Sequence, residues 1–181
     1  MKPAVDLLVE RLNGLVPRHG IVLGSGLGPL VNEVRDPVRV PYAELPGFPL
    51  SGVSGHAGEI VAGYLGRTPV IMLAGRMHYY EHGDANAMRI PIEVLMGLGV
   101  TTLILTNAAG SLREDMPPGS VMQITDHINF SGKNPLIGEP SDGRFVGMTS
   151  AYDAELQAAM RAAAEAEGVP LSQGVYMWFS G

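Results

Sequence analysis

The chain has 181 residues, 46% of them hydrophobic, which is typical of one globular domain with a core of its own. Its formal net charge is −6 and its basic residues form no runs, which argues against a nucleic-acid partner. The sequence has no cysteine, which excludes disulfides and thiolate metal sites. We therefore expect a cytoplasmic protein, and no apolar stretch reaches the roughly 18 residues that a membrane span needs.

Helical and extended patterns alternate along the chain. Residues 4–15 carry apolar side chains at helical spacing, and residues 20–23 form a short apolar run with β character. After a loop rich in proline and glycine, two strands are expected over 59–65 and 68–75, and Gly66-Arg67 between them predicts a hairpin turn. The further expected elements are a helix over 87–100, strands starting at 101 and at 120, a helix over 150–168 and a strand over 174–181.

This alternation predicts an α/β fold, with a mixed central β-sheet flanked by helices, formed by residues 1–181 as a single domain. In such sheets ligands bind at the carboxyl ends of strands. Three breaks that follow predicted strands are therefore candidate site segments: 24–28, 75–80 and 107–110.

The first break, "GSGLG" at 24–28, excludes two familiar phosphate-binding motifs. Its glycines alternate and Pro29 stands where the dinucleotide fingerprint needs a third glycine, and no Gly-Lys-Ser/Thr follows as in a P-loop. What remains is a short turn with backbone N–H groups and the hydroxyl of Ser25, suited to a single phosphate. The alternative is a tight turn with no ligand.

The second break places Arg76, His78 and Tyr80 at alternating positions, which puts their side chains on one face if the chain stays extended. Arginine offers a planar fork to phosphate oxygens, and histidine carries a proton near neutral pH. Residues 78–82 also spell H-x-x-E-H, the inverted zinc-protease signature, so a zinc hydrolase is an alternative. Glycines 75 and 83 leave that segment little room for a stable helix, and we expect no metal site.

The third break, 107–110, offers much backbone and little side chain. It suits an N–H donor better than a general base, although a packing turn of small residues has the same composition. Further along, Asp126 and His127 are expected to pair as a buried support rather than as a catalytic dyad.

Several blocks of this sequence together resemble the trimeric type of purine nucleoside phosphorylase, and the resemblance runs from about residue 21 to residue 181. It implies a nucleoside phosphorylase-like fold and no cofactor beyond inorganic phosphate, which is a co-substrate. The blocks, in chain order, are "GSGLG", "SGHAGEIVAGYLGRTPVIMLAGRMHYYE", "LTNAAGSL", "DHINFSGKNPL" and "SAYDAEL".

The resemblance implies phosphorolysis, in which phosphate attacks C1′ of a purine (deoxy)ribonucleoside and gives the free base and (deoxy)ribose 1-phosphate. Tyr80 would pack on the ribose, and Phe145 would reach the sugar pocket of a neighbouring subunit in a homotrimer. The phosphate site, with His56, Arg76 and His78 as its catalytic residues, would consist of Ser25, His56, Arg76, His78 and the backbone N–H of Ala108.

The sequence departs from the family pattern in two places. His82 stands where family members commonly have glycine, which alters the pocket rim. The chain also ends where the family continues for roughly a third more, so the part that selects the base is expected to be missing and an isolated chain to be fragile. The alternatives are a methylthioadenosine or xanthosine phosphorylase and a non-catalytic phosphate-binding fragment.

Overall fold

The computed structural model describes residues 1–49 and 58–179. They divide into two compact units, Met1–Ala109 and Gly110–Gly181, called unit 1 and unit 2 below. The predicted site residue His56 lies outside the described residues. The expectation of a single domain over 1–181 stays a prediction.

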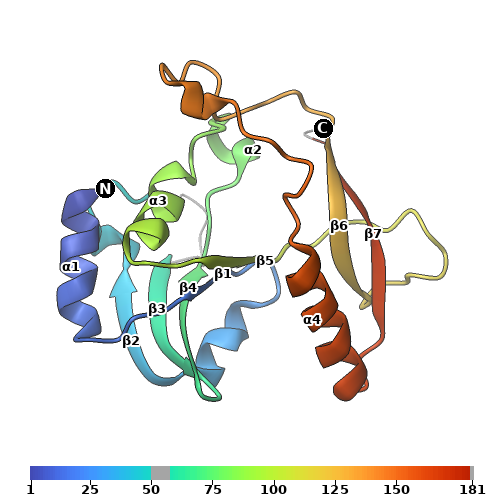
Figure 1. The fold of residues 1–181 in the computed structure, drawn as a ribbon, viewed down its shortest axis with the longest axis horizontal. Helices are drawn as coiled ribbons and strands as arrows, with labels where there is room; N and C mark the ends of the chain where they lie inside the picture. Colours follow the sequence, from blue (N-terminus) through green and yellow to red (C-terminus); the bar gives the residue numbers. More distant parts are fainter. Residues whose placement is uncertain (50–57, 180–181) are drawn as a thin grey trace. The chain divides into compact units, whose positions relative to one another are not determined.

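The described residues of unit 1 form a five-stranded sheet in the order β2-β3-β4-β1-β5 (Figure 1). Neighbours β4, β1 and β5 run parallel, whereas β2, β3 and β4 pair antiparallel, so the prediction of a mixed sheet is confirmed. The predicted hairpin is β3 and β4, joined at Gly66, which adopts a positive φ of 58°. The strands are β1 (His19–Val22), β2 (Arg35–Pro41), β3 (Glu59–Leu65), β4 (Thr68–Ala74) and β5 (Thr102–Leu105).

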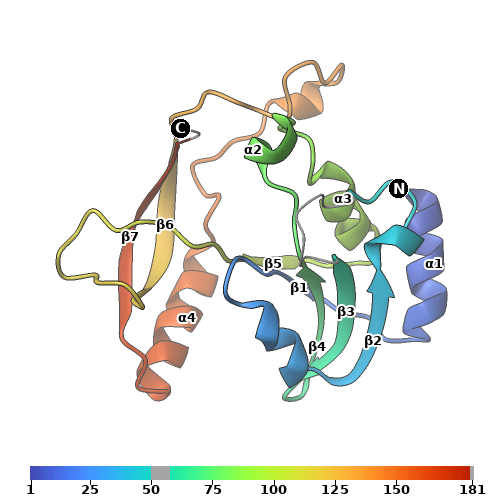
Figure 2. The ribbon, with the colours of Figure 1, turned by 180° about the vertical axis from the view of Figure 1, so that it is seen from behind.

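Helices cover both faces of this sheet because the central strands are apolar on both sides. Helices α1 (Lys2–Leu12) and α3 (Arg89–Gly97) pack with one face, where Val22, Ile71 and Leu73 are buried. The 3-10 helix η1 (Gly28–Glu33) packs on the other face, against Ile21 and Met72 (Figure 2). Alternate residues of β1 and β4 thus point into two separate cores, as expected for strands buried on both faces.

Strand β2 was not among the predicted elements. Its sequence, RDPVRVP, contains charges and prolines, which are typical of edge strands rather than of buried ones. A register shift lies between Arg35 and Val38, and Asp36 adopts a positive φ of 51° there. The short 3-10 helix η2 (Tyr42–Glu44) follows β2 directly.

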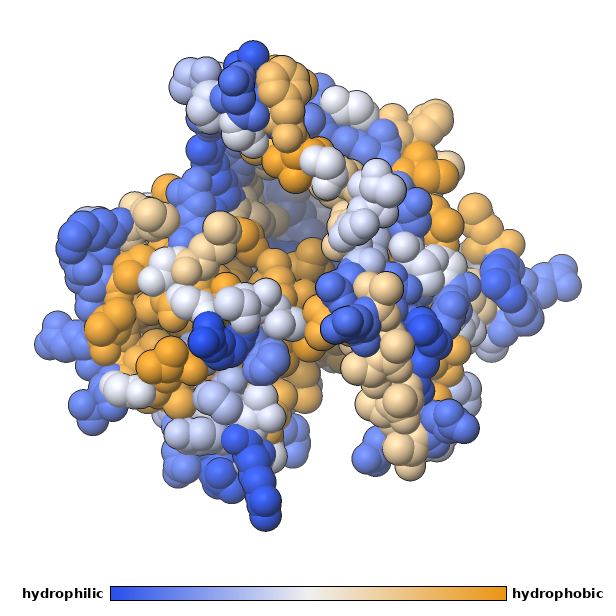
Figure 3. All heavy atoms as spheres, viewed as in Figure 1, coloured by the Kyte–Doolittle hydropathy of each residue, from blue (hydrophilic) through white to orange (hydrophobic). Residues whose placement is uncertain are grey.

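Unit 2 contains the parallel strands β6 (Val121–Asn129) and β7 (Leu171–Trp178), the 3-10 helix η3 (Asp142–Arg144) and helix α4 (Ala154–Ala166). Helix α4 begins where the Asp153 carboxylate accepts the backbone N–H of Leu156, at 2.9 Å. Many of its exposed residues are alanines, the tan spheres over α4 in Figure 3. In the described part of the whole chain, no helix combines the length and hydropathy that a membrane crossing requires.

Candidate functional site

The three predicted site segments all follow parallel strands that are neighbours in the sheet of unit 1. Residues 24–28 come shortly after β1, residues 75–80 follow β4, and residues 107–110 follow β5 and Thr106. Because the order is β4-β1-β5 and all three strands run the same way, their carboxyl ends meet at one edge. The sheet therefore brings the loops together as the sequence predicts.

The first loop approaches the third so closely that Gly24 has no room for a side chain. A Cβ at Gly24 would lie 2.8 Å from the Cα of Asn107, closer than real Cβ contacts. The Gly24 N–H donates to Oγ1 of Thr106 at 2.8 Å, and that hydroxyl donates to the carbonyl of Val22 at 3.0 Å. The backbone that comes near this glycine is thus the neighbouring strand end, while Ser25 beside it stays exposed.

Arg76 is held at the same strand end. Its Nη1 donates to the backbone carbonyl of Thr106, and its Nε donates to Nε2 of His78 at 3.3 Å. The guanidinium is planar and keeps its charge at any physiological pH, so these contacts fix a permanent cation at the carboxyl edge of the sheet.

Glu81 fixes His78 from the other side. Its Oε1 accepts the backbone N–H of His78 at 2.7 Å and lies 3.0 Å from Nδ1 of the ring. A carboxylate accepts and a guanidinium donates, so this pattern fits a neutral imidazole with its proton on Nδ1. The side chain of Glu81 is 6% exposed, and the backbone N–H of His78, followed by its ring, lowers the pKa of this carboxyl below 4.5.

Tyr80 does not continue the extended chain. His78 is extended and caps α2 (Tyr79–His82), a short helix that begins at the next residue, so the alternation of side chains ends there. The Tyr80 ring instead stacks on the His78 ring, with centroids 4.9 Å apart and planes 14° apart, and is 75% exposed. An aromatic face therefore still adjoins the histidine, by a different route from the one expected.

The zinc alternative finds no support in this geometry. In the H-x-x-E-H segment Glu81 is engaged with His78 itself. Among the described residues, no three or more histidine, aspartate or glutamate side chains are grouped so as to hold a metal ion.

A buried tyrosine supports the turn that carries Arg76. The hydroxyl of Tyr42 donates to the carbonyl of Gly75 at 2.7 Å, and Gly75 adopts a φ of +117°, which favours glycine. Burial, together with the nearby charge of Glu59, raises the pKa of the Tyr42 phenol. Neither Tyr42 nor Thr106 was singled out from the sequence, because their contacts depend on strand register.

Of the remaining predicted residues, Ala108 lies at the convergent strand ends and the others lie in unit 2. Ala108 is exposed in the loop after β5. In unit 2, Phe145 is 73% exposed, and the guanidinium carbon of Arg144 lies 4.7 Å from its ring centroid. The predicted buried pairing of Asp126 with His127 is wrong, because the exposed carboxylate accepts the backbone N–H of His127 and the ring instead lies 3.1 Å from the hydroxyl of Tyr152.

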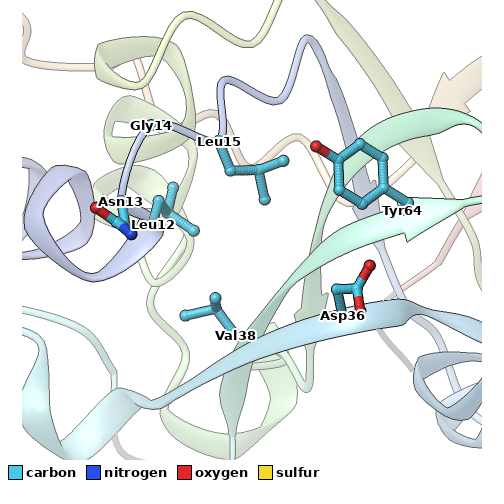
Figure 4. Close-up of a pocket in the computed structure, with 7 residues that line it drawn as sticks. All are labelled: Leu12, Asn13, Gly14, Leu15, Asp36, Val38 and Tyr64. Atoms are coloured by element: carbon cyan, nitrogen blue, oxygen red, sulfur yellow. The ribbon is translucent and has the colours of Figure 1, made fainter.

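A pocket of unit 1 lies away from these strand ends (Figure 4). It is bounded by the end of α1, the start of β2 and the end of β3. Because Tyr64 pairs with Pro69 at the start of β4, this pocket lies at the opposite edge of the sheet from Arg76. Its lining residues are Leu12, Asn13, Gly14, Leu15, Asp36, Val38 and Tyr64.

Comparison with known proteins agrees with the resemblance seen in the sequence. Residues 18–181 match the family model of the Phosphorylase superfamily. The chain is 44% identical over 169 residues to purine nucleoside phosphorylase 1 of Bacillus subtilis, covering 91% of this chain and 62% of that protein. It is 39% identical over 173 residues to purine nucleoside phosphorylase of Bos taurus, covering 91% and 60%.

Solved structures give the same answer. A crystal structure of a purine nucleoside phosphorylase in complex with ribose 1-phosphate superposes with a TM-score of 0.91 at 34% identity, covering 99% of this chain and 69% of that one. The Schistosoma mansoni purine nucleoside phosphorylase in complex with inosine gives 0.90 at 33% identity, covering 99% and 65%.

The chain thus spans about 60% of the length of these curated relatives. Over that length, the family match, the identity and the mixed sheet with its three convergent loops agree. The chain belongs to the Phosphorylase superfamily, and the relatives that it resembles are named purine nucleoside phosphorylases.

Proposed function

We propose that this chain carries the phosphate-binding part of a purine nucleoside phosphorylase. In the proposed reaction an oxygen of inorganic phosphate forms a bond to C1′ of a purine (deoxy)ribonucleoside. The bond from C1′ to the base nitrogen breaks, and its electron pair leaves with the base, which takes up a proton. The products are the free base and (deoxy)ribose 1-phosphate, and no cofactor beyond the phosphate co-substrate is used.

The observation that carries this proposal is the convergence of Arg76 and His78 with the Gly24-Ser25 turn at the end of three parallel strands. A fixed cation and a turn of small residues provide donors that a phosphate needs, and the imidazole holds that cation in place. Breaking the bond at C1′ places positive charge on the sugar, so a phosphate held in place both stabilises that charge and supplies the nucleophile.

Each site residue has a distinct role in this proposal. Arg76 neutralises the phosphate, and the Ser25 hydroxyl and the Ala108 N–H donate to its oxygens. The His78 imidazole accepts Nε–H of Arg76 at Nε2 and so holds the guanidinium in place for the phosphate. Tyr80, stacked on that imidazole, supplies the aromatic face for the ribose. His56 completes the phosphate site in the proposal by resemblance alone.

The assembly and compartment are also proposals. We propose a homotrimer in which the exposed Phe145 reaches the sugar pocket of the neighbouring subunit, by the same resemblance. The mass of the purified protein, measured by light scattering, tests the trimer. The KM for the nucleoside, compared between Phe145→Ala and the parent, tests the role of Phe145. The absence of cysteine supports a cytoplasmic location.

The test uses two forms of the protein, because the chain spans only part of its relatives. The first is the chain itself, titrated with inorganic phosphate by calorimetry. The second is a chimaera in which residues 18–181 replace the matched region of the Bacillus subtilis relative. We expect the chimaera to release base from inosine or guanosine only when phosphate is present, and Arg76→Ala to lower that rate by about 10²–10³-fold.

Arg67→Ala is the matched control, because Arg67 is exposed at the β3–β4 turn, at the other end of β4. It should leave the rate unchanged. Methylthioadenosine and xanthosine, tested beside inosine, separate the alternative substrates. Phosphate binding by the chain without turnover by the chimaera would favour a non-catalytic phosphate-binding fragment. An Arg76→Ala chimaera as active as its parent would remove Arg76 from the proposed site.

A further inference from the structure

Thr106 makes contacts to all three segments of the candidate site. Its hydroxyl accepts the N–H of Gly24 at 2.8 Å and donates to the carbonyl of Val22 at 3.0 Å, both at the end of β1. Its own carbonyl accepts Nη1 of Arg76, which follows β4. The loop with Asn107 and Ala108 begins at the next residue.

These contacts replace a backbone hydrogen bond that the parallel ladder would otherwise make. Val22 is in register with Leu105, and the N–H of Thr106 donates to the Val22 carbonyl at 3.1 Å. In a parallel pair the next bond along would run from the N–H of Gly24 to the carbonyl of Thr106. The N–H binds the threonine hydroxyl instead, and the carbonyl is engaged by the arginine.

This replacement of the backbone hydrogen bond needs a hydroxyl at position 106 and no side chain at position 24. An aliphatic residue at 106 would leave the Gly24 N–H, which is part-buried, without this acceptor. A Cβ at Gly24 would lie 2.8 Å from the Cα of Asn107, so the close approach that allows the bond depends on glycine. The contact is therefore specific to this pair of residues.

We propose that Thr106 is a positioning residue of the phosphate site, an inference that rests on the proposed function. Its hydroxyl fixes the turn that presents the Ser25 side chain, and its carbonyl fixes the guanidinium of Arg76. One residue thus sets the distance between two phosphate donors that come from different strands. Thr106 itself does not touch the phosphate, so its effect is transmitted through Gly24 and Arg76.

The test compares Thr106→Val, which keeps the shape and removes the hydroxyl, with Thr106→Ser, which keeps the hydroxyl. Thr102→Val, at the start of the same strand, is the matched control. We expect Thr106→Val to weaken binding of inorganic phosphate to the chain at least tenfold, with Thr106→Ser within threefold of the parent and Thr102→Val unchanged. In the chimaera, Thr106→Val should raise the KM for phosphate and leave the KM for inosine unchanged.

Amide exchange of Gly24 measures the contact directly. Its N–H should exchange at least tenfold faster in Thr106→Val than in the parent and in Thr106→Ser. Thr106→Ala provides the same comparisons if Thr106→Val does not fold. Parent-like phosphate binding by a folded variant without the hydroxyl, or a Thr106→Ser that binds no better than that variant, would overturn the inference alone. A parent chain that binds no phosphate would overturn the proposed function, and the inference with it.

Discussion

Glu81 shows how one buried carboxylate can orient a site residue. It accepts the backbone N–H of His78 and faces Nδ1 of the same residue, so it fixes both the start of α2 and the direction of the imidazole. Its second oxygen, Oε2, is buried and has no hydrogen-bond partner among the described residues. The hydrogen bonds of this carboxylate are thus made by Oε1, and both are to His78.

This arrangement gives a pH-dependent local stability. The folded pKa of Glu81 lies below its ordinary value of 4.5, so its contribution is fully present above pH 4.5 and is lost as pH falls through the folded pKa. An NMR titration of the side-chain carboxyl carbon should give a pKa below 4.5, and the His78 amide signal should move with it. In Glu81→Gln that movement should vanish, whereas Glu33→Gln, at an exposed position, should leave it intact. A Glu81 pKa at or above 4.5 would contradict the assignment.

At the scale of elements, the turn between β4 and α2 depends on a contact from η2. The Tyr42 hydroxyl donates to the carbonyl of Gly75, the residue before Arg76. Its ring also packs against Phe48, with ring centroids 5.0 Å apart, so the tyrosine joins the core to the site edge.

Tyr42→Phe should keep the packing and lose the hydrogen bond. We expect a loss of about 1–3 kcal/mol in the free energy of unfolding, because the partly buried carbonyl of Gly75 loses its donor. Urea unfolding followed by circular dichroism measures this, and Tyr64→Phe on β3 is the control. An unchanged free energy of unfolding would show that water replaces the phenol at no cost.

The elements that the sequence predicts best are those whose pattern is local. The β3–β4 hairpin follows from two apolar runs around Gly66, and the breaks after β1, β4 and β5 were found because apolar strands end there. Strand β2 was not predicted because Asp36 and Pro37 interrupt the alternation of apolar and polar residues. Its extended structure depends on pairing with β3. The helical turn at Tyr80 was not predicted because α2 begins with a contact between the Glu81 side chain and His78, which the residue pattern does not indicate.

The site shows the same division. Arg76, His78 and Ser25 were predicted because their residue types follow a strand. Thr106 was not predicted, because in the sequence it is one more β-branched residue at the end of an apolar run. Its role depends on which residue of β1 lies opposite it. The sequence of one strand alone does not predict its register with a strand that is distant along the chain.

At the scale of the whole molecule, the two units differ in their cores. The described clusters of buried apolar residues lie in unit 1, around Val22, Ile71 and Met72. Among the described residues 110–179 of unit 2, only Met116 and Gln123 are buried. The described apolar side chains of unit 2 are largely exposed, with Phe130 at 64% and Phe145 at 73%.

Hydrogen exchange in the isolated chain should show this difference. Backbone amides of β1 and β4, buried on both sides, should exchange at least about a hundredfold more slowly than those of β6 and β7, since protection follows local burial. Mass spectrometry of peptic fragments from both units, in one time course, provides the comparison. Equal protection of the two sheets would contradict it, and would mean that unit 2 has stability its described burial does not explain.

The location of the proposed phosphate-site residues has a thermodynamic consequence. Ser25, Arg76, His78 and Ala108 all belong to unit 1, on loops anchored to its parallel strands. An anion that binds them in the folded state alone adds free energy to the folding of unit 1, about 2.7 kcal/mol at a hundred times its Kd. The melting temperature of unit 1 should therefore rise with the logarithm of the phosphate concentration. Phosphate binding can then be followed by thermal unfolding alone, without any turnover.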